Sequence, residues 1–67
     1  MKAVSGKAIA RVLEKKGWKL KRIRGSHHFF ERPGHESITV PIHGNHTLRK
    51  GTQHTIMKAA KLTDADL

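Results

Sequence analysis

The sequence predicts an α+β fold in which one helix is followed by three strands and a second helix. Apolar residues recur at helical spacing near the start of the chain, three short stretches with strand character follow, and a second helical pattern comes after them. The turns between the expected strands are short, which favours a three-stranded antiparallel sheet. Both helices should cover one face of this sheet, because a core needs a second layer, and the other face should stay open. At 67 residues the chain is expected to form a single domain, residues 1–67.

The first helix is expected over residues 5–16. Ser5 is a suitable N-cap, because its hydroxyl can accept a hydrogen bond from a free amide of the first turn. Ile9 and Leu13 then lie one turn apart on the face that should be buried. Gly17 follows, where a residue in the left-handed conformation would end the helix.

The first strand is expected over residues 18–24. Trp18 and Leu20 alternate with lysines, which is typical of a half-buried strand. Ile23 breaks this alternation. The break predicts a bulge or a strand end near Arg22.

The second and third strands are expected over residues 27–32 and 37–42, after short turns rich in Gly, Pro and Ser. The second strand carries Phe29 and Phe30 on opposite faces, so one should pack in the core and the other should be exposed. Pro41 cannot donate to a sheet ladder, so this end of the third strand lies at an edge or has already left the sheet.

A second helix is expected over residues 52–60, with Ile56, Ala59 and Ala60 facing inward. Residues 63–66 resemble a capping box, with an aspartate three positions after a threonine. This pattern predicts one more helical turn at the end of the chain.

The charge balance indicates a polyanionic partner: 14 Lys and Arg against 5 Asp and Glu give a formal net charge of +9. Nucleic acid, an acidic protein and an anionic membrane are the candidates. No apolar run approaches a membrane span and no helix pairs a wide apolar face with a lysine-lined one, which disfavours the membrane. No secretion signal opens the chain, so the cytoplasm is the expected location. The absence of cysteine excludes a disulfide framework and a thiolate metal site.

Two stretches carry most of the positive charge, residues 15–24 and residues 43–61, and neither contains an acid. Solvated surface lysine is the simpler interpretation, but the imbalance of sign favours phosphate binding. Residues 49–52 open a helix, whose free amides can hold a phosphate, but they lack the glycine spacing of a P-loop, which disfavours nucleoside triphosphates. The candidate RNA-binding residues are Lys19, Lys21, Arg22, Arg24, Gly25, Ser26, His28, Arg49 and Lys50.

Six histidines raise the question of metal binding or catalysis. His27 and His28 should point to opposite faces of a strand, and His43 and His46 fall in a loop, so no metal site is expected. RNA carries its own nucleophile, the 2′-OH, and an imidazole can perform the proton transfers of cleavage while Lys and Arg hold the phosphate. A ribonuclease, a non-catalytic double-stranded-RNA-binding module and a module that recognises an acidic protein all stay open on the residues alone. The other histidines are expected to be surface or RNA-contacting residues.

Four segments, in this order and at this spacing, carry a family resemblance. They are LEKKGW (13–18), RGSHHFF (24–30), ITVPIH (38–43) and LRKGT (48–52), and together they extend over nearly the whole chain. Each is weak alone, since Gly-Ser-His is common, but the combination in so short a chain is specific. It resembles the HicA family of bacterial toxins, small ribonucleases that cleave mRNA and are held inactive by a cognate HicB antitoxin.

The resemblance implies a double-stranded-RNA-binding-domain-like α-β-β-β-α fold, in agreement with the order predicted above. It implies that the histidine directly after Gly25-Ser26, which is His27, is catalytic, with His28 a helper or a bystander. It further implies a metal-independent endoribonuclease without a cofactor, the toxin of a type II toxin–antitoxin system. Its partners would be mRNA and a HicB-type antitoxin, with DNA reached only through the antitoxin complex. A second catalytic imidazole in the loop of residues 43–46 stays open.

Overall fold

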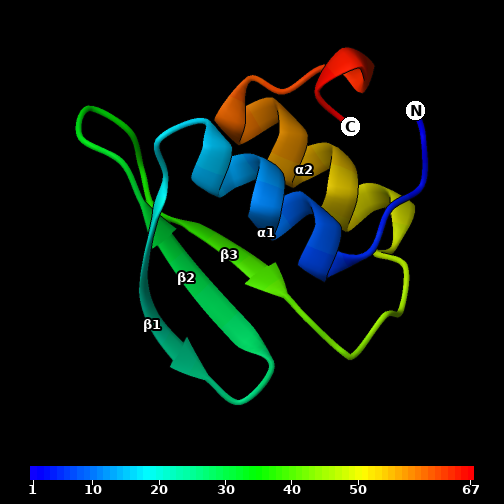
Figure 1. Ribbon diagram of the computed structural model, residues 1–67, viewed down its shortest axis with the longest axis horizontal. Coiled ribbons are helices and arrows are strands. Elements are labelled where there is room, and N and C mark those ends of the chain that lie inside the picture. Colours follow the sequence, from blue (N-terminus) through cyan, green and yellow to red (C-terminus); the bar gives the residue numbers. More distant parts are fainter.

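The computed structural model describes residues 1–67 and has the predicted order of helix, three strands and helix (Figure 1). Its elements are α1 (Gly6–Lys15), β1 (Lys19–Arg24), β2 (His27–Glu31), β3 (Ile38–Pro41), α2 (Lys50–Ala60) and a short 3-10 helix, η1 (Asp64–Asp66). The strands form one antiparallel sheet in the order β1-β2-β3, so that β1 and β3 are its edges. The α+β class, the antiparallel sheet and the edge position of the third strand are thus confirmed.

The strand register divides the sheet into two faces. Phe30 pairs with Leu20 on one side and with Ile38 on the other, so these three side chains share a face. Phe30 and Ile38 belong to one buried cluster with Ile9 of α1 and Ile56 of α2. Both helices therefore cover this face, and we call the opposite one the open face.

The core draws on every element except β1 and η1. It consists of Ile9, Ala10, Leu13, Trp18, Phe30, Ile38, Val40, Ile56, Met57 and Leu62. Neither helix is long and apolar enough to cross a lipid bilayer.

Helix α1 begins and ends as the sequence predicts. The Ser5 hydroxyl accepts a hydrogen bond from the Ala8 amide at 3.1 Å, and Gly17 follows the helix with a φ of 95°. Gly6 lies against the carbonyl oxygen of Pro41, where a Cβ atom would have no room. This close approach packs the start of α1 against the end of β3.

Strand β1 differs from its prediction, because none of its residues is buried. Trp18 is buried just before the strand, but Leu20 is 42% exposed and Ile23 is 56% exposed. Both stand on the helix side of an edge strand, outside the cluster that the helices bury. Of the two predicted alternatives, the bulge is present. Leu20 pairs with Phe30 and Arg22 pairs with Phe29, so the backbone of Lys21 has no opposite residue on β2.

Helix α2 starts at Lys50, two residues before the predicted start, with Arg49 in the N-cap position and no side-chain cap. Of the residues predicted to face inward, Ile56 is buried and Ala60 is half-buried against the core, but the prediction was wrong for Ala59, which is exposed. The buried residues are Gln53, Ile56 and Met57. Gln53 was not among the residues predicted to face inward, although it lies at helical spacing from Ile56.

Gln53 is buried because it holds the start of the chain. Its Oε1 atom accepts a hydrogen bond from the Val4 amide at 3.1 Å, and its Nε2 atom donates to the Lys2 carbonyl. A buried amide with its donor and acceptor satisfied carries little penalty. After α2, the capping box predicted at Thr63 and Asp66 is present and starts η1.

Candidate functional site

The candidate site is built on the turn between β1 and β2. Gly25 and Ser26 form a two-residue connection in which only Gly25 has a positive φ, 60°. This is the pattern of a type II′ turn, which favours glycine at its first central position. Since Arg24 pairs with His27 across the turn, the two side chains lie next to each other at the end of the sheet.

His27 lies on the open face and is exposed. It pairs with Arg24 of β1 on one side and with Pro41 of β3 on the other. The side chain of His27 is therefore flanked by a guanidinium and a proline ring, and no acidic residue pairs with it. An imidazole in this position can exchange protons with a ligand while Arg24 binds its negative charge.

His28 points to the other face of the sheet. It pairs with Ile23 and Val40, is half-buried, and its Nδ1 atom lies 3.3 Å from the Ser26 carbonyl oxygen, to which it can donate. The prediction that His27 and His28 lie on opposite faces is confirmed, and the two rings cannot bind one ligand together. No group of three or more His, Asp or Glu side chains is placed to hold a metal ion.

Phe29 and Phe30 divide between the two faces as predicted. Phe30 is buried, whereas Phe29 is half-buried on the open face. The guanidinium carbon of Arg22 lies 4.6 Å from the centre of the Phe29 ring, a cation–π contact that fixes this arginine on the open face.

The cations of β1 line the open face beside β2. By register Lys19, Arg22 and Arg24 all point to this face. Glu31 also points there, and its Oε2 atom pairs with Nζ of Lys21 at 3.8 Å. Around His27 the open face is therefore positive, and Glu31, the acidic residue of this face, lies at the other end of β2.

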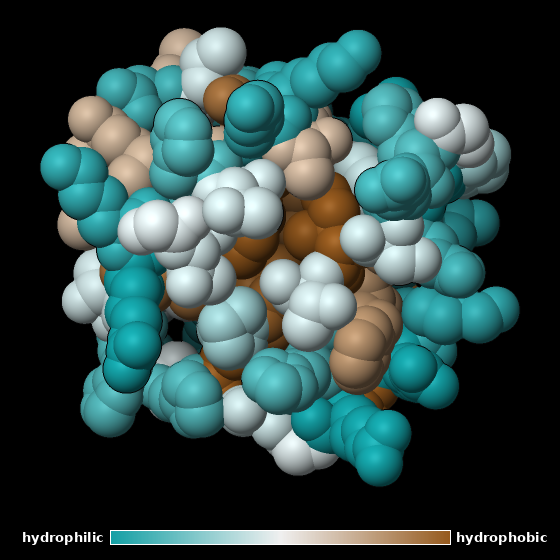
Figure 2. All heavy atoms as spheres, turned by 180° about the vertical axis from the view of Figure 1, so that it is seen from behind, coloured by the Kyte–Doolittle hydropathy of each residue, from teal (hydrophilic) through white to brown (hydrophobic).

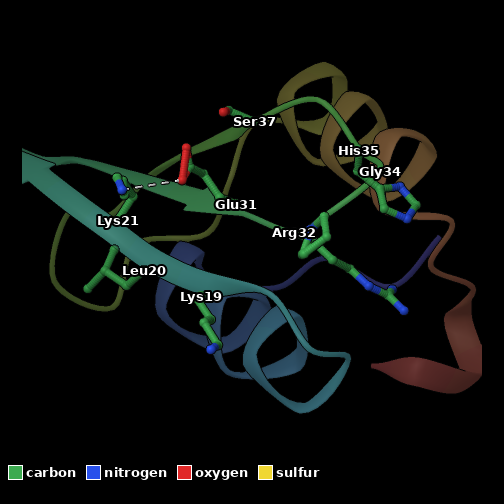
Figure 3. Close-up of a pocket in the computed structure, with 9 residues that line it drawn as sticks. Lys19, Leu20, Lys21, Glu31, Arg32, Gly34, His35 and Ser37 are labelled. Carbon is green, nitrogen blue, oxygen red and sulfur yellow. Dashed lines mark ion pairs between the residues drawn. The ribbon is translucent and has the colours of Figure 1, made fainter.

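A shallow hollow lies at that far end, where Lys19 pairs with Glu31. Figure 3 shows Arg32 and His35 extending from the turn after β2, away from the Lys21–Glu31 pair. Sequence reasoning did not single out Arg32, which follows the last residue of β2, lines this hollow and has its guanidinium close to Gly17 at the end of α1.

A second hollow lies at the His27 end, between the end of β3 and the start of α2. Pro41, His43, His46, Arg49 and Thr52 line it. The His46 amide donates to the His43 carbonyl at 3.0 Å, which closes a turn and brings the two histidines together. Of the two candidate RNA-binding residues in this region, Arg49 lines the hollow, whereas Lys50 begins α2 outside it.

The face of the molecule opposite to the one seen in Figure 1 is largely hydrophilic. Figure 2, seen from behind the view of Figure 1, shows hydrophilic side chains over most of that face, around hydrophobic atoms that lie recessed at its centre. With a formal net charge of +9, such a surface is suited to a polyanion.

Comparison with known families supports the resemblance drawn from the four sequence segments. The model of the family described as the HicA toxin of bacterial toxin–antitoxin systems matches residues 6–62. No curated protein matches the chain significantly. The family match runs from the first residue of α1 to beyond the end of α2, so it includes the whole sheet and both hollows. This protein therefore belongs to the HicA family of toxins from bacterial toxin–antitoxin systems.

Proposed function

We propose that this toxin is a metal-independent endoribonuclease that cleaves mRNA in the cytoplasm, with His27 as its catalytic acid or base. The observation that carries the proposal is the position of His27, exposed on the open face directly beside Arg24. The alternative, a non-catalytic RNA-binding module, would use the same basic surface but would have no need of an imidazole at this point.

RNA cleavage is chemistry that an imidazole and a few cations can perform. The 2′-OH loses its proton and attacks the adjacent phosphorus, the bond from phosphorus to the 5′-oxygen breaks, and that oxygen is protonated as it leaves. His27 moves a proton in this reaction, and Arg24 stabilises charge on the phosphate. The expected products are a 2′,3′-cyclic phosphate, or the 3′-phosphate formed from it, and a 5′-OH end.

The rest of the RNA backbone would follow β1. Lys19 and Arg22 continue the positive surface from Arg24 over about 16 Å, the length of five residues of an extended strand. Phe29, half-buried on the same face and in cation–π contact with Arg22, adds an aromatic ring to the proposed RNA surface. Contacts of this kind bind a single strand without strong sequence preference.

A HicB-type antitoxin would inhibit the toxin by covering the same surface. A partner that buries His27 beside Arg24 needs acidic side chains to complement the surface without leaving the arginine unpaired. In a toxin–antitoxin complex we expect His27 to be inaccessible to solvent. A complex that leaves its ring exposed would contradict this part of the proposal.

The test compares the two adjacent histidines of RGSHHFF on a long single-stranded RNA in the presence of EDTA. His27→Ala should lower cleavage by about 10²–10⁴-fold, the usual contribution of a general acid or base, while RNA affinity is retained. His28→Gln is the matched control and should keep most of the activity, because its ring lies on the other face.

Two other outcomes would point to the alternatives. RNA binding without cleavage by any variant would identify a non-catalytic RNA-binding module. Weak RNA binding at physiological salt would instead favour a module that recognises only an acidic protein.

A further inference from the structure

Cleavage by the proposed mechanism needs two proton transfers on opposite sides of one phosphate. One proton leaves the 2′-oxygen and another reaches the departing 5′-oxygen. His27 can serve one of these oxygens directly, and His28 can serve neither, because it lies on the other face of the sheet. The other oxygen therefore needs a second proton-transfer group on the open face near His27.

His43 is the titratable side chain that the sheet brings to this position. The Ile42 amide donates to the Ser26 carbonyl at 2.8 Å, so the pairing of β2 with β3 continues one residue beyond Pro41. Strand β3 ends at Pro41, and His43 comes two positions later, so the alternation of an extended chain assigns it to the same face as Pro41. Since Pro41 is directly opposite His27, His43 lies diagonally from His27.

The separation of diagonal positions suits a phosphate between the two rings. Diagonal neighbours on one face of an antiparallel pair have their Cα atoms about 7–8 Å apart. This leaves room for a phosphate with a hydrogen bond of about 2.8 Å on each side. Pro41, between the two histidines, offers no competing polar group.

The surroundings of His43 also suit an anion. The hollow that Pro41 and His43 line contains His46 and Arg49 and no acidic side chain. His43 is exposed, so its ring is accessible to a ligand. Arg49 can bind the scissile phosphate or the next one along the chain.

We infer that His43 is the second catalytic residue of the proposed ribonuclease, an inference that rests on the proposed function. One of His27 and His43 accepts the proton of the 2′-OH as the bond from O2′ to phosphorus forms. The other donates a proton to the 5′-oxygen as its bond to phosphorus breaks. The histidine that acts as base ends one proton richer, the histidine that acts as acid ends one proton poorer, and exchange with water restores both.

The experiment uses variants of the whole chain and two RNA substrates. His43→Ala should lower cleavage of ordinary RNA by about 10²–10⁴-fold, with RNA affinity and melting temperature retained. His46→Ala is the matched control, an imidazole in the same turn and hollow, and should lower cleavage far less.

The second substrate carries sulfur in place of the bridging 5′-oxygen, a leaving group that departs without protonation. It should restore cleavage by the variant that lacks the acid and not by the variant that lacks the base. Rescue of only one of His27→Ala and His43→Ala is the expected result, and it assigns the two roles. The pH–rate profile of the wild type should be bell-shaped, and each variant should lose one limb, with Arg24, His46 and Arg49 as the other charged or titratable neighbours.

The failures of the two proposals are distinguishable. A wild-type protein that binds RNA without cutting it would overturn the proposed function. Cleavage that needs His27 but is unchanged in His43→Ala would overturn only the role of His43. That role would also be overturned if His46→Ala were as damaging as His43→Ala, or if the sulfur substrate rescued both histidine variants or neither.

Discussion

The two edge strands of the sheet have opposite compositions and opposite environments. Strand β3 carries no charge, and its inward residues Ile38 and Val40 are 4% and 0% exposed. Strand β1 has the sequence KLKRIR, and none of its residues is buried. The sheet thus has one edge that contributes to the core and one edge that presents cations beside His27.

The basic edge has a structural role as well. An edge strand offers unpaired backbone groups to other chains, and lysines and a bulge are devices that prevent such pairing. Strand β1 has both, with the bulge at Lys21. The cations that keep this edge from pairing with another chain are therefore also available for the proposed RNA surface. One strand of a small domain can serve both purposes.

The largest effect on stability is the expected difference between two isoleucine-to-alanine substitutions, one in each edge strand. Ile38→Ala in β3 should lower the free energy of unfolding by about 2–5 kcal/mol, because it removes buried methylenes and leaves a cavity. Ile23→Ala in β1 should change it by less than about 0.5 kcal/mol, since this side chain is 56% exposed. Urea unfolding of both variants measures the difference.

Equal losses of unfolding free energy in the two variants would contradict the conclusion that, of the two edge strands, only β3 contributes to the core. They would mean that β1 packs in solution against a surface that the structure leaves exposed. RNA affinity should be unaffected by either change, provided that Ile38→Ala remains folded under the conditions of the binding assay.

An intermediate effect is expected at the turn that joins β1 to β2. Gly25→Ala should destabilise the protein by about 1–2 kcal/mol, because a φ of 60° is unfavourable for a residue with a Cβ atom. The added methyl group would meet nothing within 4 Å, so the loss is one of backbone conformation. Thermal unfolding measures it.

Gly51→Ala is the matched control for this prediction. A Cβ atom at Gly51 also meets nothing within 4 Å, but the residue is in α2. Here the same substitution should stabilise the protein by about 0.5–1 kcal/mol. Changes of the same sign at the two positions would show that the backbone of the turn does not determine the loss.

Local signals made much of the fold predictable. The Ser5 cap, the stop at Gly17 and the bulge after Leu20 each depend on a few neighbouring residues, and the structure confirms all three. The period of two along a strand also placed His27 and His28, and Phe29 and Phe30, on opposite faces. Predictions of this kind hold because backbone geometry alone determines them.

Features that depend on distant segments were missed. Gln53 is buried because Lys2 and Val4 use its amide, a contact across some fifty residues that no helical pattern announces. The alternation of Leu20 with lysines predicted a half-buried strand with Leu20 on its buried side, but the exposure of Leu20 depends on how far the helices extend over the sheet. The hollow lined by Pro41 and Arg49 could not be predicted from the sequence either, because it forms only where the end of β3 meets the start of α2.

The smallest effect concerns the segment that leads into β1. If β1 itself adds little stability, contacts of the segment before it must keep β1 in position. One of these contacts joins Lys16 to the end of the chain. Nζ of Lys16 lies 2.8 Å from Oδ1 of Asp66, and the Thr63 amide donates to Oδ2 of Asp66 at 2.7 Å. The hydrogen bond from Lys16, followed by that from the Thr63 backbone, lowers the pKa of Asp66 below its ordinary value of 3.8.

A lowered pKa means that the unfolded chain binds a proton more readily than the folded protein does. The contribution of Asp66 is therefore fully present above the unfolded value of 3.8 and is lost as the pH falls through the lower folded value. Asp66→Asn should reduce the urea midpoint slightly at pH 7, and the difference from wild type should shrink below about pH 3.8. In a Lys16→Gln background the same substitution should have a weaker pH dependence, because the largest cause of the shift is gone. A difference between wild type and Asp66→Asn that persists undiminished in acid would mean that the aspartate stabilises the end of the chain by packing, and that the entry to β1 does not depend on its charge.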